Sequence, residues 1–153
     1  MIVPAIGDFR LDAEADTARL GAALGRAVKK GEAICLSGPL GAGKSVLARG
    51  LIRGLSPAER DVPSPTFTLV QFYRGARFPI AHFDLYRLTS PQEAFEIGLD
   101  EALEDGAAVI EWAERLGHHL PRDRLDVELT PDGETRRARL SPHGAWEDRP
   151  LDV

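Results

Sequence analysis

Hydrophobic residues in the first third of the chain recur with two different periods. Apolar residues at helical spacing predict an amphipathic helix over 13–30, for which Asp12 is the expected N-cap. The continuous apolar run 33–36 predicts a buried strand, and residues 46–52 again show helical spacing. The sequence therefore predicts helix, strand and helix in this order, with a glycine-rich loop between the strand and the second helix.

Shorter, β-rich runs dominate the rest of the chain. Two such runs surround a glycine-containing turn at 74–77, and two more surround the turn signal at 131–133, so each pair predicts an antiparallel hairpin. Pro91 is well placed to open a helix. After Pro142 no pattern predicts an element. The elements expected here are a hairpin over 66–86, a helix over 91–103, a strand over 107–110 and a hairpin over 125–140.

The glycine-rich loop at 38–45 reads Gly-Pro-Leu-Gly-Ala-Gly-Lys-Ser and matches the phosphate-binding pattern G-x-x-x-x-G-K-[ST]. Glycines let backbone N–H groups approach a phosphate, and the N-terminus of the following helix adds donors and a favourable dipole. Lys44 is expected to reach the β- and γ-phosphates of a nucleoside triphosphate, and the Ser45 hydroxyl to face Mg²⁺. The predicted nucleotide-binding residues of the loop are Gly38, Gly41, Ala42, Gly43, Lys44, Ser45 and Val46.

Two acidic residues at the ends of predicted strands could help Ser45 to hold Mg²⁺, which prefers oxygen ligands. Glu111 follows the apolar run 107–110, an arrangement typical of a Walker B element. Asp84 ends a similar run. Either side chain alone could be an ordinary solvated acid, but a phosphate loop in the same chain favours metal binding by both. The sequence does not decide which of the two activates the attacking water.

Further candidate residues lie close to these acids. A strand period of two places His82, Asp84 and Tyr86 on one face, which predicts either an active-site wall or a half-exposed strand. Thr66, in a stiff proline-containing connector, could offer its hydroxyl to the γ-phosphate or to Mg²⁺, although plain turn chemistry explains it equally well. Trp112 is a candidate for the core, for stacking on the nucleotide or for contact with a partner.

Composition and charge limit the class of protein. The 153 residues are 43% hydrophobic and 28% charged, which predicts one globular domain over 1–153, with a loosely ordered tail after about residue 142. The net charge of −5 argues against strong unaided binding to nucleic acid. No apolar run approaches the ~20 residues that span a bilayer. No secretory signal is recognisable, and the lone Cys35 cannot form an internal disulfide, so a cytoplasmic location is expected.

Together these elements predict an α/β fold. Hairpins require antiparallel strand pairs, whereas a strand that leads into a phosphate loop belongs to a parallel core. We therefore expect a three-layer sandwich like that of P-loop NTPases, with a mixed parallel and antiparallel sheet. The order of the strands does not follow from the pattern.

The motifs also resemble a known family. The phosphate loop 38–45, Ser-Pro-Thr-Phe-Thr at 64–68, His-Phe-Asp-Leu-Tyr-Arg at 82–87 and Ile-Glu-Trp at 110–112 occur in the order and spacing typical of the TsaE family, also called YjeE. The resemblance extends from the first helix to the last hairpin, and the segments 82–87 and 110–112 are more specific than the loop. Ser45 stands where the family more often has Thr, which preserves the hydroxyl.

The resemblance implies a function. Members of the TsaE family are small bacterial ATPases of tRNA threonylcarbamoyladenosine (t6A) synthesis. They bind ATP and Mg²⁺, and they hydrolyse ATP slowly unless joined to the partner proteins TsaB and TsaD. Those partners transfer the threonylcarbamoyl group to adenosine 37 of tRNAs that read ANN codons. The resemblance therefore implies that this chain meets tRNA only indirectly, through the complex.

The resemblance also implies roles for individual residues. Lys44 would be the phosphate-binding lysine and a catalytic residue. Ser45 and Glu111 would be Mg²⁺ ligands, and Asp84 a catalytic or metal-linked acid. Thr66 would belong to a switch-like segment with a catalytic role. By looser analogy, the residues that border the adenine would be Glu14 and Arg136.

Two other functions stay open at the level of the sequence. Many phosphate-loop proteins are small-molecule kinases, but these usually need an arginine-bearing lid that excludes water. No separate lid segment is recognisable, although Arg74, Arg77 and Arg87 could contribute to one. The other possibility is a nucleotide-gated interaction module with little turnover. A GTPase is not expected, because the sequence contains no N-K-x-D motif for guanine.

Overall fold

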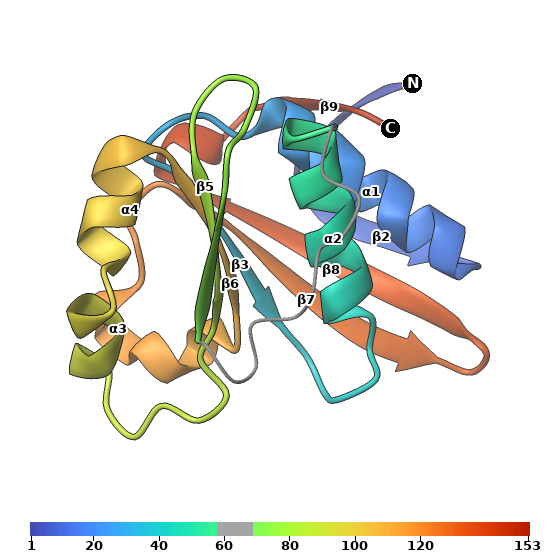
Figure 1. Cartoon of the computed structure of the whole chain (residues 1–153). Helices are drawn as coiled ribbons and strands as arrows, with labels where there is room; N and C mark the ends of the chain where they lie inside the picture. The colour runs from blue at the N-terminus through green and yellow to red at the C-terminus, as the bar shows by residue number, and fades with distance from the viewer. Residues whose placement is uncertain (58–68) are drawn as a thin grey trace.

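The computed structural model describes residues 1–57 and 69–153, and these residues form three layers around a mixed β-sheet (Figure 1). The strands are β1 (Ile2–Pro4), β2 (Gly7–Leu11), β3 (Ala33–Ser37), β4 (Val70–Tyr73), β5 (Ile80–Asp84), β6 (Ala107–Glu111), β7 (Arg124–Asp132), β8 (Thr135–His143) and β9 (Pro150–Asp152). In the described part of the chain, the main sheet has the order β2-β8-β7-β3-β6-β5-β4. Strands β7, β3, β6 and β5 are parallel, and the hairpins β4–β5 and β7–β8 are antiparallel. The predicted α/β fold with a mixed sheet is confirmed.

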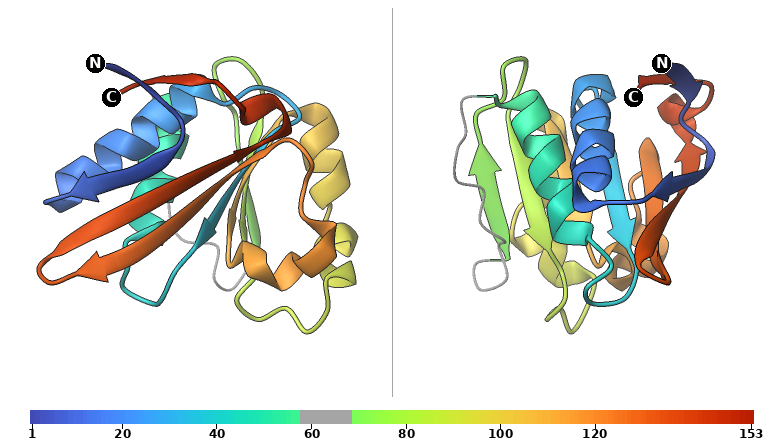
Figure 2. Two further views of the ribbon diagram at one scale, coloured as in Figure 1. Left: turned by 180° about the vertical axis from the view of Figure 1, so that it is seen from behind. Right: turned by 90° about the vertical axis from the view of Figure 1, so that its right-hand side faces the viewer.

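Helices cover both faces of the parallel strands (Figure 2). They are α1 (Glu14–Ala27), α2 (Lys44–Leu55), α3 (Gln92–Glu96), α4 (Leu99–Asp105) and the 3₁₀ segments η1 (Ala113–His119) and η2 (Gly144–Trp146). Alternate residues of a strand point to opposite faces, so the sheet separates two hydrophobic cores. Ile34 and Val109 belong to the core under α1 and α2, whereas Cys35 and Ile110 belong to the core under α3 and α4. Among the described residues, no helix is both long and apolar enough to cross a membrane.

The first helix differs from the prediction at both ends. Its N-cap is Ala13, whose backbone N–H donates to the Asp16 carboxylate over 2.9 Å. Asp12, the predicted cap, instead accepts a hydrogen bond from Arg10. The helix also ends earlier than predicted, because Val28 is already extended and buries its side chain in the core. The carboxylate of Asp16, inside the first turn, therefore accepts the hydrogen bond at the start of the helix, in place of the predicted Asp12.

The helix predicted over 91–103 is in fact two short helices. Gly98 adopts a left-handed conformation with φ 98° and separates α3 from α4. Other residues rarely adopt this conformation, so the glycine explains why the break occurs here. The break lets both Ala94 on α3 and Leu99 on α4 bury their side chains in the same core. Helical spacing alone did not reveal this interruption.

The chain after Pro142 is more ordered than predicted. Trp146 and Leu151 are fully buried there. Strand β9 pairs with β1, which places the two termini side by side (Figure 1). The guanidinium of Arg149 forms a buried ion pair with Glu32 and lies 4.4 Å from the centroid of the Trp146 ring. The expectation of a loosely ordered tail is therefore wrong, because long-range contacts that leave no local pattern hold this segment.

Helices α1 and α2 pack so closely that glycines of one touch the backbone of the other. A Cβ atom on Gly21 would lie 2.3 Å from the Leu47 carbonyl oxygen, and one on Gly25 would lie 2.3 Å from that of Leu51. Gly50 on α2 is similarly close to the backbone of α1. The contacts leave no room for side chains at these positions. Because α2 begins at the phosphate loop, this packing also fixes where the loop lies.

Replacing Gly25 with alanine is expected to lower the free energy of unfolding by about 2 kcal/mol. The methyl group raises helix propensity by about 1 kcal/mol, but overlap with a rigid backbone carbonyl costs about 3 kcal/mol, the upper end of usual overpacking costs. Urea denaturation measures the change. The control is Ala15→Leu on the exposed face of α1, which should stay within about 0.5 kcal/mol of the wild type. A Gly25→Ala variant as stable as the wild type would show that the helices can separate without cost.

Candidate functional site

The phosphate loop joins the end of β3 to the N-terminus of α2 and borders a cleft of about 560 Å³. Gly43 is the N-cap of α2 and has φ 102°, a conformation that favours glycine. The first turn of α2 contains no acidic residue, so no carboxylate of this turn competes for its N–H groups. These groups and the positive end of the helix dipole make this end of the cleft suitable for an anion.

The cleft brings together most of the residues predicted from the sequence. The predicted nucleotide-binding residues that line it are Gly41, Gly43, Lys44, Ser45, Val46, Glu14, Trp112 and Arg136. The acids Asp84 and Glu111 line it as well. Thr66 lies outside the described residues, so its predicted role stays a prediction. The cleft is also lined by residues to which the sequence assigned no nucleotide contact, among them Thr17, Tyr86 and Glu134.

Two of the predicted loop residues do not line the cleft. Ala42 is fully buried, and its N–H donates to the Pro39 carbonyl over 3.2 Å within the loop. Gly38 has φ 132°, and a Cβ atom there would lie 2.2 Å from the carbonyl oxygen of Leu129. These residues shape the loop and let it pass close to β7. In this structure neither of them faces the cleft.

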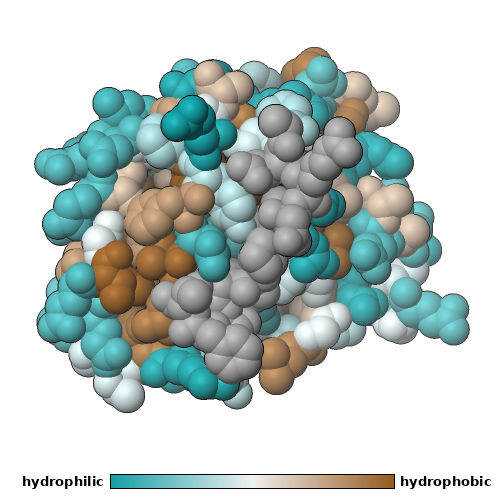
Figure 3. Space-filling view, viewed as in Figure 1, coloured by the Kyte–Doolittle hydropathy of each residue, from teal (hydrophilic) through white to brown (hydrophobic). Residues whose placement is uncertain are grey.

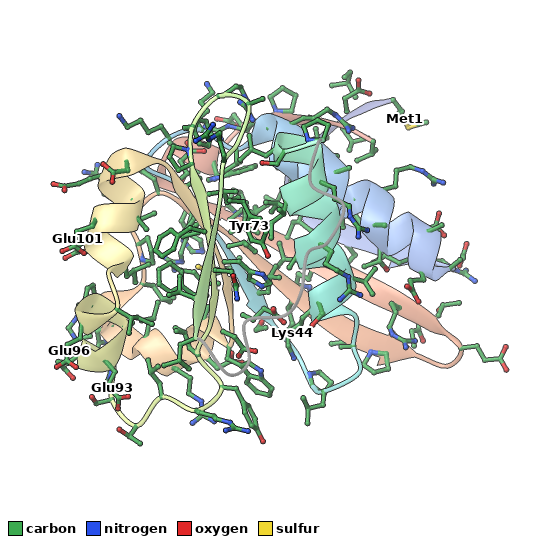
Figure 4. All side chains as sticks on the ribbon, viewed as in Figure 1. Met1, Lys44, Tyr73, Glu93, Glu96 and Glu101 are labelled. Carbon is green, nitrogen blue, oxygen red and sulfur yellow. The ribbon has the colours of Figure 1, made fainter. Side chains whose placement is uncertain are left out.

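Lys44 lies at the base of α2, against the loop that it follows (Figure 4). Its Nζ donates to the carbonyl oxygens of Gly38 and Pro39, the latter over 3.1 Å. The ammonium also lies 4.2 Å from the centroid of the Trp112 ring. Burial lowers the pKa of Lys44, whereas the negative charges of Glu111, Glu114 and Asp84 favour the protonated form. The result is a buried cation held beside the place where the cleft suits an anion.

Asp84 and Glu111 lie side by side at the ends of neighbouring parallel strands. The register of β5 and β6 pairs them directly, and both side chains are buried. Glu111 Oε1 lies 3.3 Å from the hydroxyl oxygen of Ser45. Asp84 Oδ1 accepts a hydrogen bond from the backbone N–H of Tyr86 over 3.1 Å. Strands β5 and β6 and helix α2 thus each place at the cleft one side chain whose oxygen is suited to binding a metal ion.

These three oxygen-bearing side chains provide only part of a binding site for a hard cation. Within residues 1–57 and 69–153, no group of three or more His, Cys, Asp or Glu side chains could hold a metal ion by itself. Mg²⁺ does not need such a group, because it is usually bound by one or two carboxylates together with substrate phosphates and waters. Glu111, Asp84 and the Ser45 hydroxyl therefore fit Mg²⁺ that arrives with a phosphorylated ligand.

Trp112 adopts a backbone conformation that a bulky residue seldom shows. Its φ and ψ are 60° and 42°, in the left-handed region. The turn ends β6 and brings the indole across Lys44, while its ring lies 5.0 Å from that of Tyr86. Such strain concentrates at functional sites. The sequence indicated Trp112 only through its place beside Glu111, and the positive φ could not be read from it.

The other end of the cleft is formed by α1 and the β7–β8 turn. Glu14 lies in the first turn of α1. Arg136 comes from β8 and donates to the Gly41 carbonyl over 3.2 Å, so it links the hairpin to the phosphate loop. Glu134 lines the same part of the cleft. It was not predicted from the sequence, although it lies in the turn two residues before Arg136. This end has the polar groups that could border a nucleobase.

A smaller hollow of about 260 Å³ lies on the other face of the sheet, between β5 and α4. Phe72, which is 62% exposed, lies at its edge. Figure 3 shows hydrophobic side chains gathered on the surface around α3, α4 and β5. In Figure 4, Glu93, Glu96 and Glu101 project outward from the same helices. None of the residues that line this hollow is a predicted site residue, so the cleft at the phosphate loop remains the candidate site.

Comparisons with known proteins agree with the motifs. The family described as "Threonylcarbamoyl adenosine biosynthesis protein TsaE" matches residues 11–139. The tRNA threonylcarbamoyladenosine biosynthesis protein TsaE of a Nostoc species is 42% identical over 140 residues, which cover 88% of this chain and 84% of the relative. The protein of the same name from Rickettsia felis is 38% identical over 127 residues, with coverages of 83% and 74%.

A solved structure shares the fold. The crystal structure of Bacillus subtilus YdiB superimposes with a TM-score of 0.75 at 26% sequence identity, and the match covers 94% of this chain and 87% of that one. The matched family region contains the phosphate loop, both acids and Trp112. On these grounds the chain belongs to the TsaE family of threonylcarbamoyl adenosine biosynthesis proteins.

Proposed function

We propose that this protein is a Mg²⁺-dependent ATPase that supports t6A modification of tRNA together with TsaB and TsaD. The observation that carries the proposal is a phosphate loop facing two carboxylates across one cleft. The cleft volume of about 560 Å³ lies within the range of about 300–1,000 Å³ that is usual for small-molecule sites. Membership of the TsaE family supports a role in tRNA modification.

The residues of the cleft would act mainly by position and charge, as in other phosphoryl-transfer sites. Lys44 and the N–H groups of the first turn of α2 would bind the β- and γ-phosphates. For this, Lys44 would exchange the carbonyls of Gly38 and Pro39 for phosphate oxygens. Bound Mg²⁺ would neutralise charge that develops on the phosphates, with Ser45 and Glu111 as its protein ligands. Asp84 would orient or activate the attacking water.

The net charge supports an indirect contact with tRNA. A chain with a net charge of −5 lacks the excess of Lys and Arg that neutralises a phosphate backbone, so tRNA would be bound by the partner proteins.

One of the arginines that could belong to the lid of a kinase has its hydrogen bond away from the cleft. Arg77 donates to the Gly25 carbonyl over 2.8 Å, at the end of α1 away from the phosphate loop. This arrangement favours an ATPase over a kinase.

Calorimetric titration of nucleotide-free protein with ATP and Mg²⁺ tests the proposal. Glu111→Ala is expected to weaken Mg²⁺-dependent ATP binding by about 10- to 100-fold, and Asp84→Ala by clearly less. The reason is that Glu111 already contacts the Ser45 hydroxyl, whereas one oxygen of Asp84 is used by a backbone N–H. Glu104→Ala is the control, because it removes an exposed carboxylate of α4 that does not line the cleft.

Two outcomes would change these assignments. A larger loss in Asp84→Ala than in Glu111→Ala would exchange the roles of the two acids. A well-folded wild type that binds neither ATP nor ADP in the presence of Mg²⁺ would overturn the proposed function. Release of phosphate from ATP without an acceptor, faster when TsaB and TsaD are added, is expected of the ATPase and would argue against a metabolite kinase.

A further inference from the structure

His82 lies on β5 next to the cleft but does not line it. Its side chain is buried, and its Nε2 lies 2.6 Å from Glu111 Oε2. The register of the two parallel strands pairs His82 with Val109, so the imidazole reaches Glu111 diagonally across β5 and β6. His82 therefore contacts Glu111 of the proposed site without lining the cleft, and it lies in the layer between the sheet and α2.

The two oxygens of the Glu111 carboxylate have different partners. Oε2 pairs with His82, while Oε1 faces the Ser45 hydroxyl at 3.3 Å. A carboxylate can only accept hydrogen bonds, so the imidazole must donate and Nε2 must carry a proton. Ser45 and His82 thus hold the carboxylate at both of its oxygens.

The other ring nitrogen indicates which tautomer is present. Among the described residues, Nδ1 of His82 has no hydrogen-bond partner. A proton there would be an unsatisfied buried donor, whereas a bare nitrogen leaves only an unused acceptor. A proton on Nε2 and a bare Nδ1 fit these surroundings. In that form the only hydrogen bond the ring donates is the one to Glu111.

Orientation matters for Glu111 because the terminal torsion of a glutamate side chain has a broad energy minimum. A buried carboxylate held at one oxygen by a strand-borne imidazole cannot turn freely about this torsion. Groups that hydrogen-bond to metal-binding side chains fix their orientation, and their loss typically lowers metal affinity about 10- to 100-fold. The bond from His82 leaves Oε1 directed to Ser45 and the cleft.

We propose that His82 is a positioning residue, which orients the Glu111 carboxylate for Mg²⁺ through the hydrogen bond from Nε2 and itself touches neither metal nor nucleotide. This inference rests on the proposed function, since it concerns the Mg²⁺ that accompanies ATP. A purely structural role of His82 predicts something different. In that case its replacement would change stability, but not the concentration of Mg²⁺ needed for ATP binding.

The test measures ATP binding by calorimetry as Mg²⁺ is varied, in the wild type and in three variants of His82. The side-chain amide of His82→Gln can reach the place of Nε2, so its Mg²⁺ midpoint should stay close to that of the wild type. The amide of His82→Asn reaches only the place of Nδ1, and His82→Leu has no donor. Both should raise the midpoint about 10- to 100-fold. Affinity for ATP in EDTA should be the same in all four proteins.

Val109→Ala is the matched control, because Val109 is fully buried and lies opposite His82 in the strand pair. It should lower stability without moving the Mg²⁺ midpoint. A folded His82→Leu or His82→Asn with the midpoint of the wild type would overturn the inference. So would an equal shift of the midpoint in Val109→Ala, since the effect would then be one of packing.

A measurement on the wild type covers the case in which the variants do not fold. Nitrogen-15 NMR of the imidazole rings in nucleotide-free protein should show a protonated Nε2 and a bare Nδ1 for His82, and a proton on Nδ1 alone would overturn the inference. The two proposals can fail separately. A wild type that binds no ATP at any Mg²⁺ concentration fails the proposed function, and this inference with it. A wild type that binds normally beside an unshifted His82→Leu fails this inference alone.

Discussion

Replacing Lys44 with alanine is expected to slow ATP hydrolysis by about 100- to 1,000-fold, the loss that follows removal of one group stabilising the transition state. Lys44 is a buried cation at the point where the loop and the first turn of α2 suit an anion. Without its ammonium, Glu111 and Asp84 would face the developing charge of the phosphates with less compensation. Phosphate release in single-turnover experiments, with and without TsaB and TsaD, measures the change.

The control for this variant is Lys30→Ala, which removes an exposed lysine far from the cleft lining. It should hydrolyse ATP at the rate of the wild type. Circular dichroism must show that Lys44→Ala is folded, because Lys44 also bonds to the loop carbonyls of Gly38 and Pro39. Near-normal turnover in a folded Lys44→Ala protein would overturn the catalytic assignment of this residue.

Removing either charge of the pair between Glu32 and Arg149 is expected to lower the free energy of unfolding by about 3–5 kcal/mol. The side chains are 5% and 9% exposed, and Arg149 Nη2 donates to Glu32 Oε2 over 2.6 Å. Glu32 also accepts the backbone N–H of Lys29, and Arg149 also donates to the carbonyl of Ala27. A remaining partner would therefore stay buried with an uncompensated charge.

Urea unfolding of Glu32→Ala and Arg149→Ala measures this effect. The pair lies at the start of β3, at the opposite end of the strand from the phosphate loop, so affinity for ATP and Mg²⁺ should not change. The control is Arg137→Ala, whose half-exposed pair with Asp132 should contribute at most about 1 kcal/mol. The double variant Glu32→Leu/Arg149→Met should lose less than the two single losses added together, because it leaves no buried charge. Single variants within about 1 kcal/mol of the wild type would contradict the argument.

Features that depend on near neighbours in the chain were predictable. The strand, loop and second helix around Gly43 and Lys44 follow from an apolar run, from glycines and from helical spacing, each of which acts over a few residues. Both hairpins are confirmed for the same reason, since a turn joins strands that are adjacent in sequence. The predicted N-cap of α1 was wrong by one position. Asp12 and Asp16 are both suitable acceptors, and only the local geometry selects Asp16, which accepts the N–H of Ala13.

Features that join distant segments were not predictable in the same way. Asp84 and Glu111 could each be proposed as an acid at the end of a strand, but their contact depends on β5 lying next to β6. The bond from His82 to Glu111, the turn at Trp112 and the burial of Trp146 have the same origin. Hydrophobic periodicity says which face of a strand is buried, and it does not say which strand is its neighbour.

The sequence by itself determined the phosphate loop, its helix, the α/β class and the family, because a short run of residues encodes backbone conformation and donor positions. Only the tertiary structure decided that Glu111 lies beside the Ser45 hydroxyl and that His82 pairs with its other oxygen. It also decided that the chain after Pro142 is held by the ion pair of Arg149 with Glu32. These depend on strand order and on side chains brought together from distant parts of the chain, and their energies arise only when the whole sheet is assembled.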